Sequence, residues 1–553
     1  MAQQHFNRGD SLHRNNWKEA HERNVQPCYE LSDDNEIDDR IPKDTSLEDI
    51  INACPNPPEM KDMERMRNSK CTFMIAPFKC DQLRPNCEPD PLLIGNGYHD
   101  IWDDSHVHMP CSPKYTDKYK KSTWTYICRQ LHRLQDICNI GGAIFEDLQI
   151  TIEKCVGRRF NMESLQILIE QVYTADEQMY FMSAVLSNIC NLALNVDKIF
   201  GQPPPLLRIK SDASVTMSQK QAASLLACAF FCLFPLRSDD TKPSEYEYFQ
   251  NPNFNTLYKR GPRQKVEKLK CILHYFHRIT EKMPNGVISI RRYVLPENLY
   301  PNWSRSPAKL SRMCVISDKK IEDINSVLQV DFANEYIGGG VLRNGCVQEE
   351  IRFSICPEML VSLLLCERME KNECIFLIGC ERFSSYKGYG DHFEFNGDFR
   401  DKTLRDNWGR KWCPLVAMDA IFFHESDKQY DIHNVNRELI KAYASFRPRK
   451  TGTGNNERYG IATGNWGCGV FNGDRQLKAI IQLMAASEAG RPLIYAAFRD
   501  KRISKSFSDV YNYLLQQQAT VGDLYQYLQE YPHRANRKSL FDYILHTPIS
   551  QNL

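Results

Sequence analysis

The chain has 553 residues, which is too long for one ordinary domain, so two or three folded units are expected. Hydrophobic residues make up 42% and charged residues 25%, as is typical of a soluble globular protein with sizeable cores. The formal net charge of +1 gives no general attraction to nucleic acid or to a membrane surface, so any anionic ligand must be held by local geometry.

The 21 cysteines are too few for a disulfide-rich scaffold, their number is odd, and none are spaced as CxxC. Four cysteines and two histidines lie near enough in sequence to suggest a metal site: Cys71, Cys80, Cys87, Cys111, His106 and His108. Their spacing matches no common zinc module. We therefore expect free thiols in a reducing compartment, no metal site and no cofactor.

The beginning of the chain carries charged residues of both signs and no apolar core segment, so neither a secretory signal nor a transit peptide is expected. The longest apolar stretch, 222–234, is shorter than the ~20 residues that cross a bilayer. We expect a protein of the nucleus and cytoplasm without membrane association.

Residues 1–88 are polar, with an acidic cluster at 33–39 and prolines at 55–58, and are expected to be a disordered tail, with partner binding as an open role. Residues 98–111 have the pattern of an extended segment that packs on the folded body. His106 and His108 alternate within it, and we expect them to be surface or packing side chains.

Residues 89–285 are expected to form a mostly helical accessory region. Ser218 followed by Gln221 predicts a capping box, and apolar residues then recur at helical spacing as far as Leu233, before Pro235. The densest group of basic residues lies between 259 and 270. Either a solvated helix face or a patch that contacts a polymer would have this composition, and we favour the solvated face.

Residues 286–553 alternate between strand and helix patterns. Short apolar runs of strand type lie at 287–290, 327–332, 374–378, 415–418, 459–462 and 493–497. Helical patterns lie at 437–444, 475–489, 508–516 and 521–530, the last with Thr520 as its cap and Asp523 three residues later. The alternation predicts a mixed α/β domain with a largely buried sheet.

The stretch 328–353 has the composition of a site. Asp331 lies in an apolar strand pattern, glycines occupy 338 to 340, and Glu349 and Glu350 open the next apolar segment. Three consecutive glycines suggest positive φ or close backbone approach, and their N–H groups could bind an anion such as phosphate. A carboxylate beside apolar packing has a raised pKa, which suits acid/base chemistry.

A second glycine loop spans 463–471, between a predicted strand and a predicted helix. In open α/β sheets ligands bind outside the carboxyl ends of strands, so two such loops suggest two walls of one diphosphate cleft. Neither loop fits GxGxxG or GxxxxGK[ST], which argues against a dehydrogenase and a P-loop enzyme. A third glycine-rich stretch, 451–455, follows no strand and is expected to be a disordered loop.

The run Gly338-Gly339-Gly340 followed by Gln348-Glu349-Glu350 resembles the motif of poly(ADP-ribose) glycohydrolases, and 330–334 and 462–469 match that family too. The resemblance covers roughly 98–543. It implies a three-layer macrodomain at 286–553 with a mixed central sheet, preceded by the helical region. It also implies hydrolysis of the ribose–ribose O-glycosidic bonds of poly(ADP-ribose).

Glycosidases commonly place two carboxylates on opposite sides of the anomeric carbon. Neighbouring helical residues point roughly 100° apart, so Glu349 and Glu350 are not expected to flank a sugar in that way. We expect Glu350 to be a single general acid/base, with Glu349 and Asp331 positioning the substrate and tuning Glu350.

The resemblance also implies substrate contacts. Ile321 and Glu322 would contact adenine, Phe498 would stack on it, Tyr389 would close over the ligand, Phe471 would press on the distal ribose, and Asn334 and Gln348 would bind ribose or the leaving unit. Both glycine loops would contribute the remaining contacts: Gly339, Gly340, Asn465, Trp466, Gly467, Cys468, Gly469 and Val470. The expected partner is poly(ADP-ribose) on modified proteins, bound by a monomer without recognition of a nucleic-acid sequence.

Two other functions remain open. A macrodomain that binds ADP-ribose without cleaving it would have the same glycine loops, although it would gain nothing from carboxylates near a diphosphate. A pyrophosphohydrolase would need a cluster of carboxylates that binds Mg²⁺.

Overall fold

The computed structural model describes residues 46–549 except 55, 69, 79–87, 96, 118, 236–245, 449–458 and 534–538. Within that part of the chain, nine strands join one sheet: β1 (Cys71–Phe73), β2 (Ala213–Ser218), β3 (Val287–Val294), β4 (Met313–Ile316), β5 (Leu328–Ala333), β6 (Glu373–Gly379), β9 (Lys411–Asp419), β10 (Ile461–Gly464) and β11 (Leu493–Ala496). In space they follow the order β1-β2-β3-β6-β9-β5-β10-β11-β4. Two further strands, β7 (Ser384–Lys387) and β8 (Glu394–Asp398), pair as a separate hairpin.

Five neighbouring strands of the sheet, β9, β5, β10, β11 and β4, run parallel. Strand β3 is antiparallel to β2 and β6, and β6 is antiparallel to β9. Because parallel strands end at the same edge of a sheet, the loops after β5, β9, β10 and β11 meet there.

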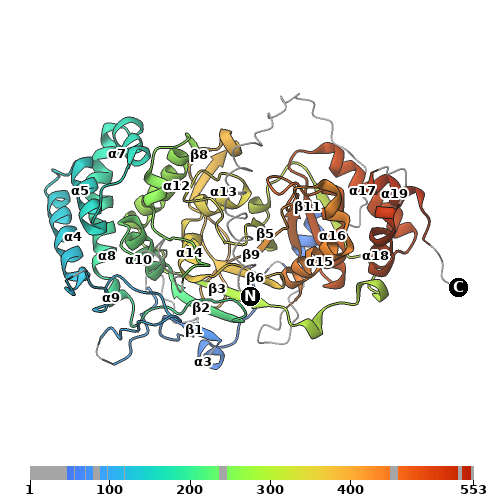
Figure 1. Ribbon diagram of the computed structural model, residues 1–553, viewed down its shortest axis with the longest axis horizontal. Coiled ribbons are helices and arrows are strands. Elements are labelled where there is room, and N and C mark those ends of the chain that lie inside the picture. The colour runs from blue at the N-terminus through green and yellow to red at the C-terminus, as the bar shows by residue number, and fades with distance from the viewer. Residues whose placement is uncertain are drawn as a thin grey trace, which may run out of the picture.

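The α-helices between β1 and β3 are α4 (Thr123–Asn139), α5 (Phe145–Val156), α6 (Glu163–Ile167), α7 (Ala175–Tyr180), α8 (Leu186–Leu194), α9 (Val196–Ile199), α10 (Gln219–Phe230), α11 (Asn255–Tyr258) and α12 (Gln264–Glu281). Those after β5 are α13 (Gln348–Ile355), α14 (Val361–Leu365), α15 (Ile432–Phe446), α16 (Arg475–Glu488), α17 (Lys501–Gln516), α18 (Val521–Glu530) and α19 (Leu540–His546). In Figure 1 the early helices lie at the left, the sheet in the centre and the last helices at the right.

Two hydrophobic cores lie on the two faces of the sheet. Leu328 and Val330 of β5 pack in the core that α15 to α19 complete. Ala333 packs in the other core, with α13, α14 and the early helices. Since side chains alternate along a strand, Asp331 faces the same side as Ala333, which is the side covered by α13. The expected mixed α/β domain with a helical region before it is confirmed.

The structure differs from the expected disorder of 1–88 in the part that it describes. Residues Leu47–Asn52 form α2, Met63–Met66 form α3, and β1 joins the sheet edge. Leu47 and Ile50 are buried against β4, β10 and β11. These segments are too short to be stable alone and are held by the sheet they join, which local composition does not reveal. Residues 1–45 lie outside the described part.

The six expected strands and four expected helices are all present. Both predicted capping boxes are confirmed: Ser218 Oγ accepts from Gln221 N at 3.1 Å and Ser218 N donates to Gln221 Oε1 at 3.0 Å, and Thr520 and Asp523 pair in the same way. The sequence did not predict β1, β2 or β4, which have three to six residues each and lie at or near the sheet edges. The stretch 451–455 lies outside the described residues.

Candidate active site

The first glycine loop connects the carboxyl end of β5 to the start of α13. This arrangement brings the two glutamates that open α13 beneath the loop that precedes it. Glu349 and Glu350 are 3% and 4% exposed. Two neighbouring carboxylates at such burial must be stabilised by hydrogen bonds.

Glu349 is held by the backbone on both carboxylate oxygens. Its Oε1 accepts from Gly338 N at 2.6 Å, and its Oε2 accepts from Asn334 N at 2.9 Å. Burial raises the pKa of Glu349 well above its ordinary value, and the nearby Asp331 and Glu350 carboxyls raise it further, against the opposing effect of the two N–H groups.

Glu350 is held in the same manner by different amides. Its Oε1 accepts from Gly340 N at 2.8 Å, and its Oε2 accepts from Val347 N at 2.9 Å. The second bond caps the first turn of α13, where a carboxylate also interacts favourably with the helix dipole. Glu350 therefore joins the two ends of the loop 340–347.

The expectation that the first glycine loop binds an external anion is wrong for these amides. Gly338 N and Gly340 N donate to the two glutamates, and Gly339 N donates to Tyr336 O at 3.1 Å. The anions that this loop holds are the protein's own carboxylates. Gly339 has a φ of +49°, and a Cβ there would lie 2.6 Å from both Glu349 Oε2 and Glu350 Oε1. Only glycine fits between the two carboxyl groups.

Asp331 lies behind the two glutamates on β5. Its side chain is fully buried, and neither carboxylate oxygen has a hydrogen-bond partner among the described residues. Burial and the nearby Glu350 raise the pKa of Asp331 well above its ordinary value, while Arg352 on α13 opposes the increase. A buried carboxyl without donors is stable chiefly in its neutral form.

Gln348 was expected to contact ligand, but its amide is used by the sheet. Its Oε1 accepts from Phe332 N at 2.8 Å, and its Nε2 donates to Val330 O at 3.1 Å. Strand β10 pairs with β5 only as far as Gln329. Beyond that residue, the Gln348 side chain makes the hydrogen bonds to the β5 backbone. Its backbone N donates to the Tyr389 hydroxyl at 3.1 Å.

Tyr389 and Phe498 come together from distant parts of the chain. Their ring centroids lie 4.8 Å apart, with 55° between the ring planes. Phe498 is 51% exposed and has a φ of +51°, which turns the chain just after β11. An exposed aromatic beside a second ring is suited to bind a flat ligand, because the ring already lies outside the core.

Glu322 is partly buried, and Ile321 before it is buried. The Tyr386 hydroxyl donates to Glu322 Oε1, and Lys320 Nζ lies 3.6 Å from the centroid of the Tyr386 ring. The sequence had pointed to Tyr389 and passed over Tyr386, three residues earlier on the same hairpin. Its position in strand β7, pointing back to Glu322, depends on the tertiary fold.

The second glycine loop joins β10 to α16 and differs from the first in how its amides are used. Cys468 N donates to Asn465 O at 3.1 Å, whose side-chain Oδ1 accepts from the Tyr495 hydroxyl at 2.9 Å. Four other amides of the loop donate to none of the residues that the structure describes: those of Gly467, Gly469, Val470 and Phe471. Amides of this kind at the carboxyl end of a strand are suited to bind an anion.

Trp466 was expected to contact ligand, and the structure instead places its indole in the core. The side chain is fully buried, its Nε1 donates to Met418 O at 2.9 Å, and Lys478 Nζ lies 4.2 Å from the ring. The Cys468 side chain is partly buried, its Sγ donates to Trp466 O at 3.4 Å, and burial raises the pKa of the thiol to about 12. The Trp466 indole thus supports the loop from the core.

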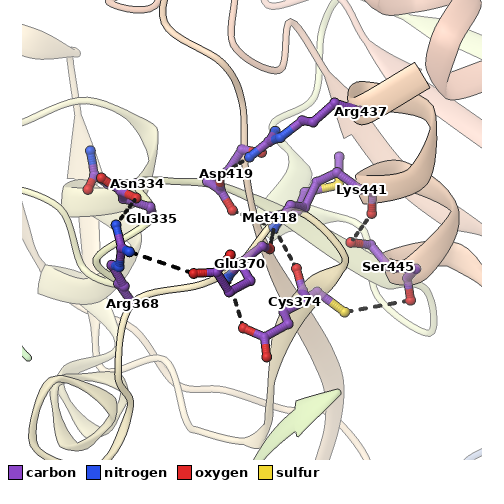
Figure 2. A network of polar contacts seen from close by, with 12 residues as sticks. Asn334, Glu335, Arg368, Glu370, Cys374, Met418, Asp419, Arg437, Lys441 and Ser445 are labelled. Carbon is purple, nitrogen blue, oxygen red and sulfur yellow. Dashed lines mark hydrogen bonds and ion pairs between the residues drawn. The ribbon is translucent and has the colours of Figure 1, made fainter. Parts of the chain in front are cut away.

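A network of ion pairs, buried at Asp419 and partly exposed at Arg368, fixes the end of β9 beside the site (Figure 2). Asp419 lies opposite Ala333 of β5 and pairs with Arg437 and with Lys441, the latter at 2.6 Å. Arg368 lies 3.7 Å from Glu335, the residue after Asn334. No pattern in the sequence indicates this network, because its members come from separate segments and resemble ordinary surface charges.

No three His, Cys, Asp or Glu side chains in the described part of the chain are grouped so as to hold a metal ion, and Cys80 and Cys87 lie outside that part. Among the described helices, none is both long and apolar enough to cross a membrane.

Two family models match the chain. One, described as "Poly (ADP-ribose) glycohydrolase (PARG), helical domain", matches residues 173–292, and the other, "Poly (ADP-ribose) glycohydrolase (PARG), Macro domain fold", matches residues 300–505. Poly(ADP-ribose) glycohydrolase 1 of Arabidopsis thaliana is 34% identical over 392 residues, which covers 59% of this chain and 71% of that protein.

A second Arabidopsis thaliana protein, probable poly(ADP-ribose) glycohydrolase 2, is 30% identical over 434 residues, with 67% of this chain and 82% of that protein covered. Poly(ADP-ribose) glycohydrolase 1 of Caenorhabditis elegans is 35% identical over 358 residues, with 62% of this chain and 44% of that protein covered. These similarities span both the helical region and the sheet domain.

Proposed function

The chain belongs to the poly(ADP-ribose) glycohydrolase family, and on that premise we propose that it hydrolyses the ribose–ribose O-glycosidic bonds of poly(ADP-ribose), with Glu350 as the general acid/base. The observation that carries the proposal is the pair of buried carboxyl groups at the carboxyl edge of the sheet. Each is oriented by two backbone N–H groups. Such fixed orientation is what acid/base chemistry at one bond requires.

In the proposed reaction Glu350 begins each turnover as the acid. It passes its proton to the oxygen of the departing ribose as the glycosidic C–O bond breaks, and the carbon left behind takes on oxocarbenium character. The Glu350 carboxylate then accepts a proton from a water molecule whose oxygen bonds to that carbon. This step completes the hydrolysis and returns Glu350 to its acid form.

Glu349 and Asp331 have supporting roles in this proposal. Glu349 fixes the turn at Asn334 and Gly338, and thus the surface against which the reacting ribose lies. The raised pKa of Asp331 favours its neutral form, so this residue places an uncharged carboxyl beside Glu349 and Glu350. We assign Asn334 a contact with ribose, and we assign no ligand contact to the Gln348 side chain because β5 already uses its amide.

The second glycine loop is the proposed site for the diphosphate. The amides of Gly467, Gly469, Val470 and Phe471 are available for an anion, whereas those of the first loop are occupied. Adenine would stack on the exposed face of the Phe498 ring, beside Tyr389, and Glu322 would accept from its exocyclic amine in place of Tyr386. Phe471 would then lie against the distal ribose.

A polymer assay separates this activity from the two alternatives. We expect the protein to release ADP-ribose from radiolabelled poly(ADP-ribose) equally well with and without EDTA. Intact polymer together with tight ADP-ribose binding would instead identify a non-catalytic reader. AMP release that EDTA abolishes would identify a metal-dependent pyrophosphohydrolase.

Replacing Phe498 with alanine tests the adenine contact. We expect the Kd for ADP-ribose, measured by calorimetry, to rise about tenfold because one stacking face is lost. The melting temperature should change little, since the ring is half exposed. Tyr126→Ala, which removes an exposed aromatic on α4, is the matched control and should leave the Kd unchanged. An unchanged Kd in Phe498→Ala would refute the contact.

A further inference from the structure

Helix α12 of the helical region inserts a lysine beneath the first glycine loop. Lys268 is fully buried, although it belongs to the basic segment that the sequence had suggested to be a solvated face. Its Nζ donates to the carbonyl oxygens of Val341, Arg343 and Gly345 at 2.7, 2.8 and 2.6 Å, and lies 3.4 Å from Gly340 O. One ammonium group thus forms hydrogen bonds with several carbonyl oxygens of a single loop.

The same loop is bound on its other side by Glu350. The carboxylate accepts from Gly340 N and Val347 N, at the two ends of the loop. The loop 340–347 is therefore held between two buried side chains. Lys268 donates to its carbonyl oxygens, and Glu350 accepts from its backbone N–H groups. A change in the position of Lys268 must move the amides that orient the Glu350 carboxyl group.

We propose that Lys268 is a positioning residue for hydrolysis, one that fixes the loop 340–347 so that the Glu350 carboxyl points at the scissile bond. The inference rests on the proposed function of Glu350 and adds to it a residue from the helical region. The helical region then has a part in the chemistry, because Lys268 of α12 fixes the loop 340–347.

The positive charge of Lys268 is as important for this positioning role as the shape of its side chain. Among the described residues, the charged and titratable groups that act on Lys268 are Glu350 of α13, Cys346 of the loop and Lys265 of α12 itself. Burial lowers the pKa of Lys268 to about 8, and Glu350 and Cys346 partly offset that effect. As pH rises through that value the ammonium loses a proton and one of its donors, and the loop loses a hydrogen bond.

Three variants test the proposal: Lys268→Met, Lys268→Arg and the control Lys265→Met. Lys265 lies one turn earlier on α12, is also buried, and donates to Thr256 O and Lys259 O, away from the glycine loop. Its replacement should therefore cost similar stability without altering the site. Turnover of poly(ADP-ribose), the Kd for ADP-ribose and the melting temperature are measured for each variant.

We expect Lys268→Met to lower kcat by about 100-fold, as a displacement of about 1 Å at a catalytic group does. The Kd for ADP-ribose should change by less than about threefold, because the diphosphate loop is separate. Lys265→Met should keep kcat. The wild-type kcat should fall further above about pH 8 than any decline that all variants share, and Lys268→Arg should regain part of the lost kcat and lack that additional decline, since a guanidinium stays protonated there.

An unchanged kcat in Lys268→Met, or equal losses of kcat in Lys268→Met and Lys265→Met, would overturn the positioning role. If Lys268→Met does not fold, the pH profile of Lys268→Arg decides, and an alkaline decline identical to that of the wild type would overturn the proposal. A wild-type protein that leaves the polymer intact would refute the proposed function itself, which is a different outcome from an active wild type with an active Lys268→Met.

Discussion

Replacing Glu350 with glutamine is expected to lower the kcat for poly(ADP-ribose) by about 1,000-fold, within the range that a general acid/base contributes. Glutamine keeps the shape of the side chain but cannot deliver or accept the required proton. Its amide can still accept from one of the two N–H groups that Glu350 binds, Gly340 N or Val347 N. ADP-ribose should therefore bind with a nearly unchanged Kd.

Glu349→Gln is the matched control for this variant. Glu349 lies on the same helix, has nearly the same burial, and also accepts from two backbone N–H groups. Because its partners shape the turn at Asn334 and Gly338, we expect Glu349→Gln to weaken ADP-ribose binding, whereas Glu350→Gln should not. If Glu350→Gln loses binding and turnover together, Glu350 is structural and the proposed mechanism fails.

Gly339→Ala is expected to lower kcat by about 100-fold, since it displaces both carboxyl groups at once. The new Cβ would lie 2.6 Å from an oxygen of each glutamate, so at least one carboxyl must leave the amides that orient it. Turnover of poly(ADP-ribose) by the purified variant, at matched folded fraction, is the measurement.

The control for Gly339→Ala must place alanine in a similarly strained backbone, but at a position where the new Cβ contacts no other group. Gly157, at the end of α5, has a φ of +75°, and a Cβ at this position would meet no neighbouring side chain or backbone atom within 4 Å. Gly157→Ala should cost about 1–2 kcal/mol of stability through its left-handed backbone and leave kcat unchanged. Equal kcat in Gly339→Ala and the wild type would show that the carboxyl groups tolerate displacement, against the proposed geometry.

The two glycine loops have similar compositions and different roles. The first turns its amides inward and orients two carboxyl groups of its own chain. The second leaves four amides without an acceptor among the described residues, on top of a buried tryptophan. One loop thus holds the proposed acid, and the other is proposed to hold the ligand. We therefore expect Glu350 variants and second-loop variants to affect turnover and ligand binding separately.

Figure 1 places the helical region against the face of the sheet that α13 covers, and the shared core joins the two. Lys268 extends that contact to the backbone carbonyls of the loop 340–347. In this arrangement the stability of α12 and the geometry of Glu350 are linked. Destabilising substitutions in the helical region are then expected to act on kcat when they move α12.

The sequence by itself determined the elements whose causes are local. Alternating strand and helix patterns identified the α/β domain, and Ser218 with Gln221 identified the start of α10, because capping and hydrophobic periodicity depend on residues within one or two turns. It also located Glu349 and Glu350, since their positions at the start of a helix after three glycines can be recognised from the order of residues alone.

Only the tertiary structure decided which groups the buried side chains of the site contact. The carbonyls that Lys268 binds lie 72 to 77 residues further along the chain, and Trp466 is buried against Met418, 48 residues before it. Burial of a charge or an indole depends on neighbours brought together by the sheet and not by the chain. For the same reason the sequence predicted external ligands for the amides of Gly338 and Gly340, which the fold gives to Glu349 and Glu350.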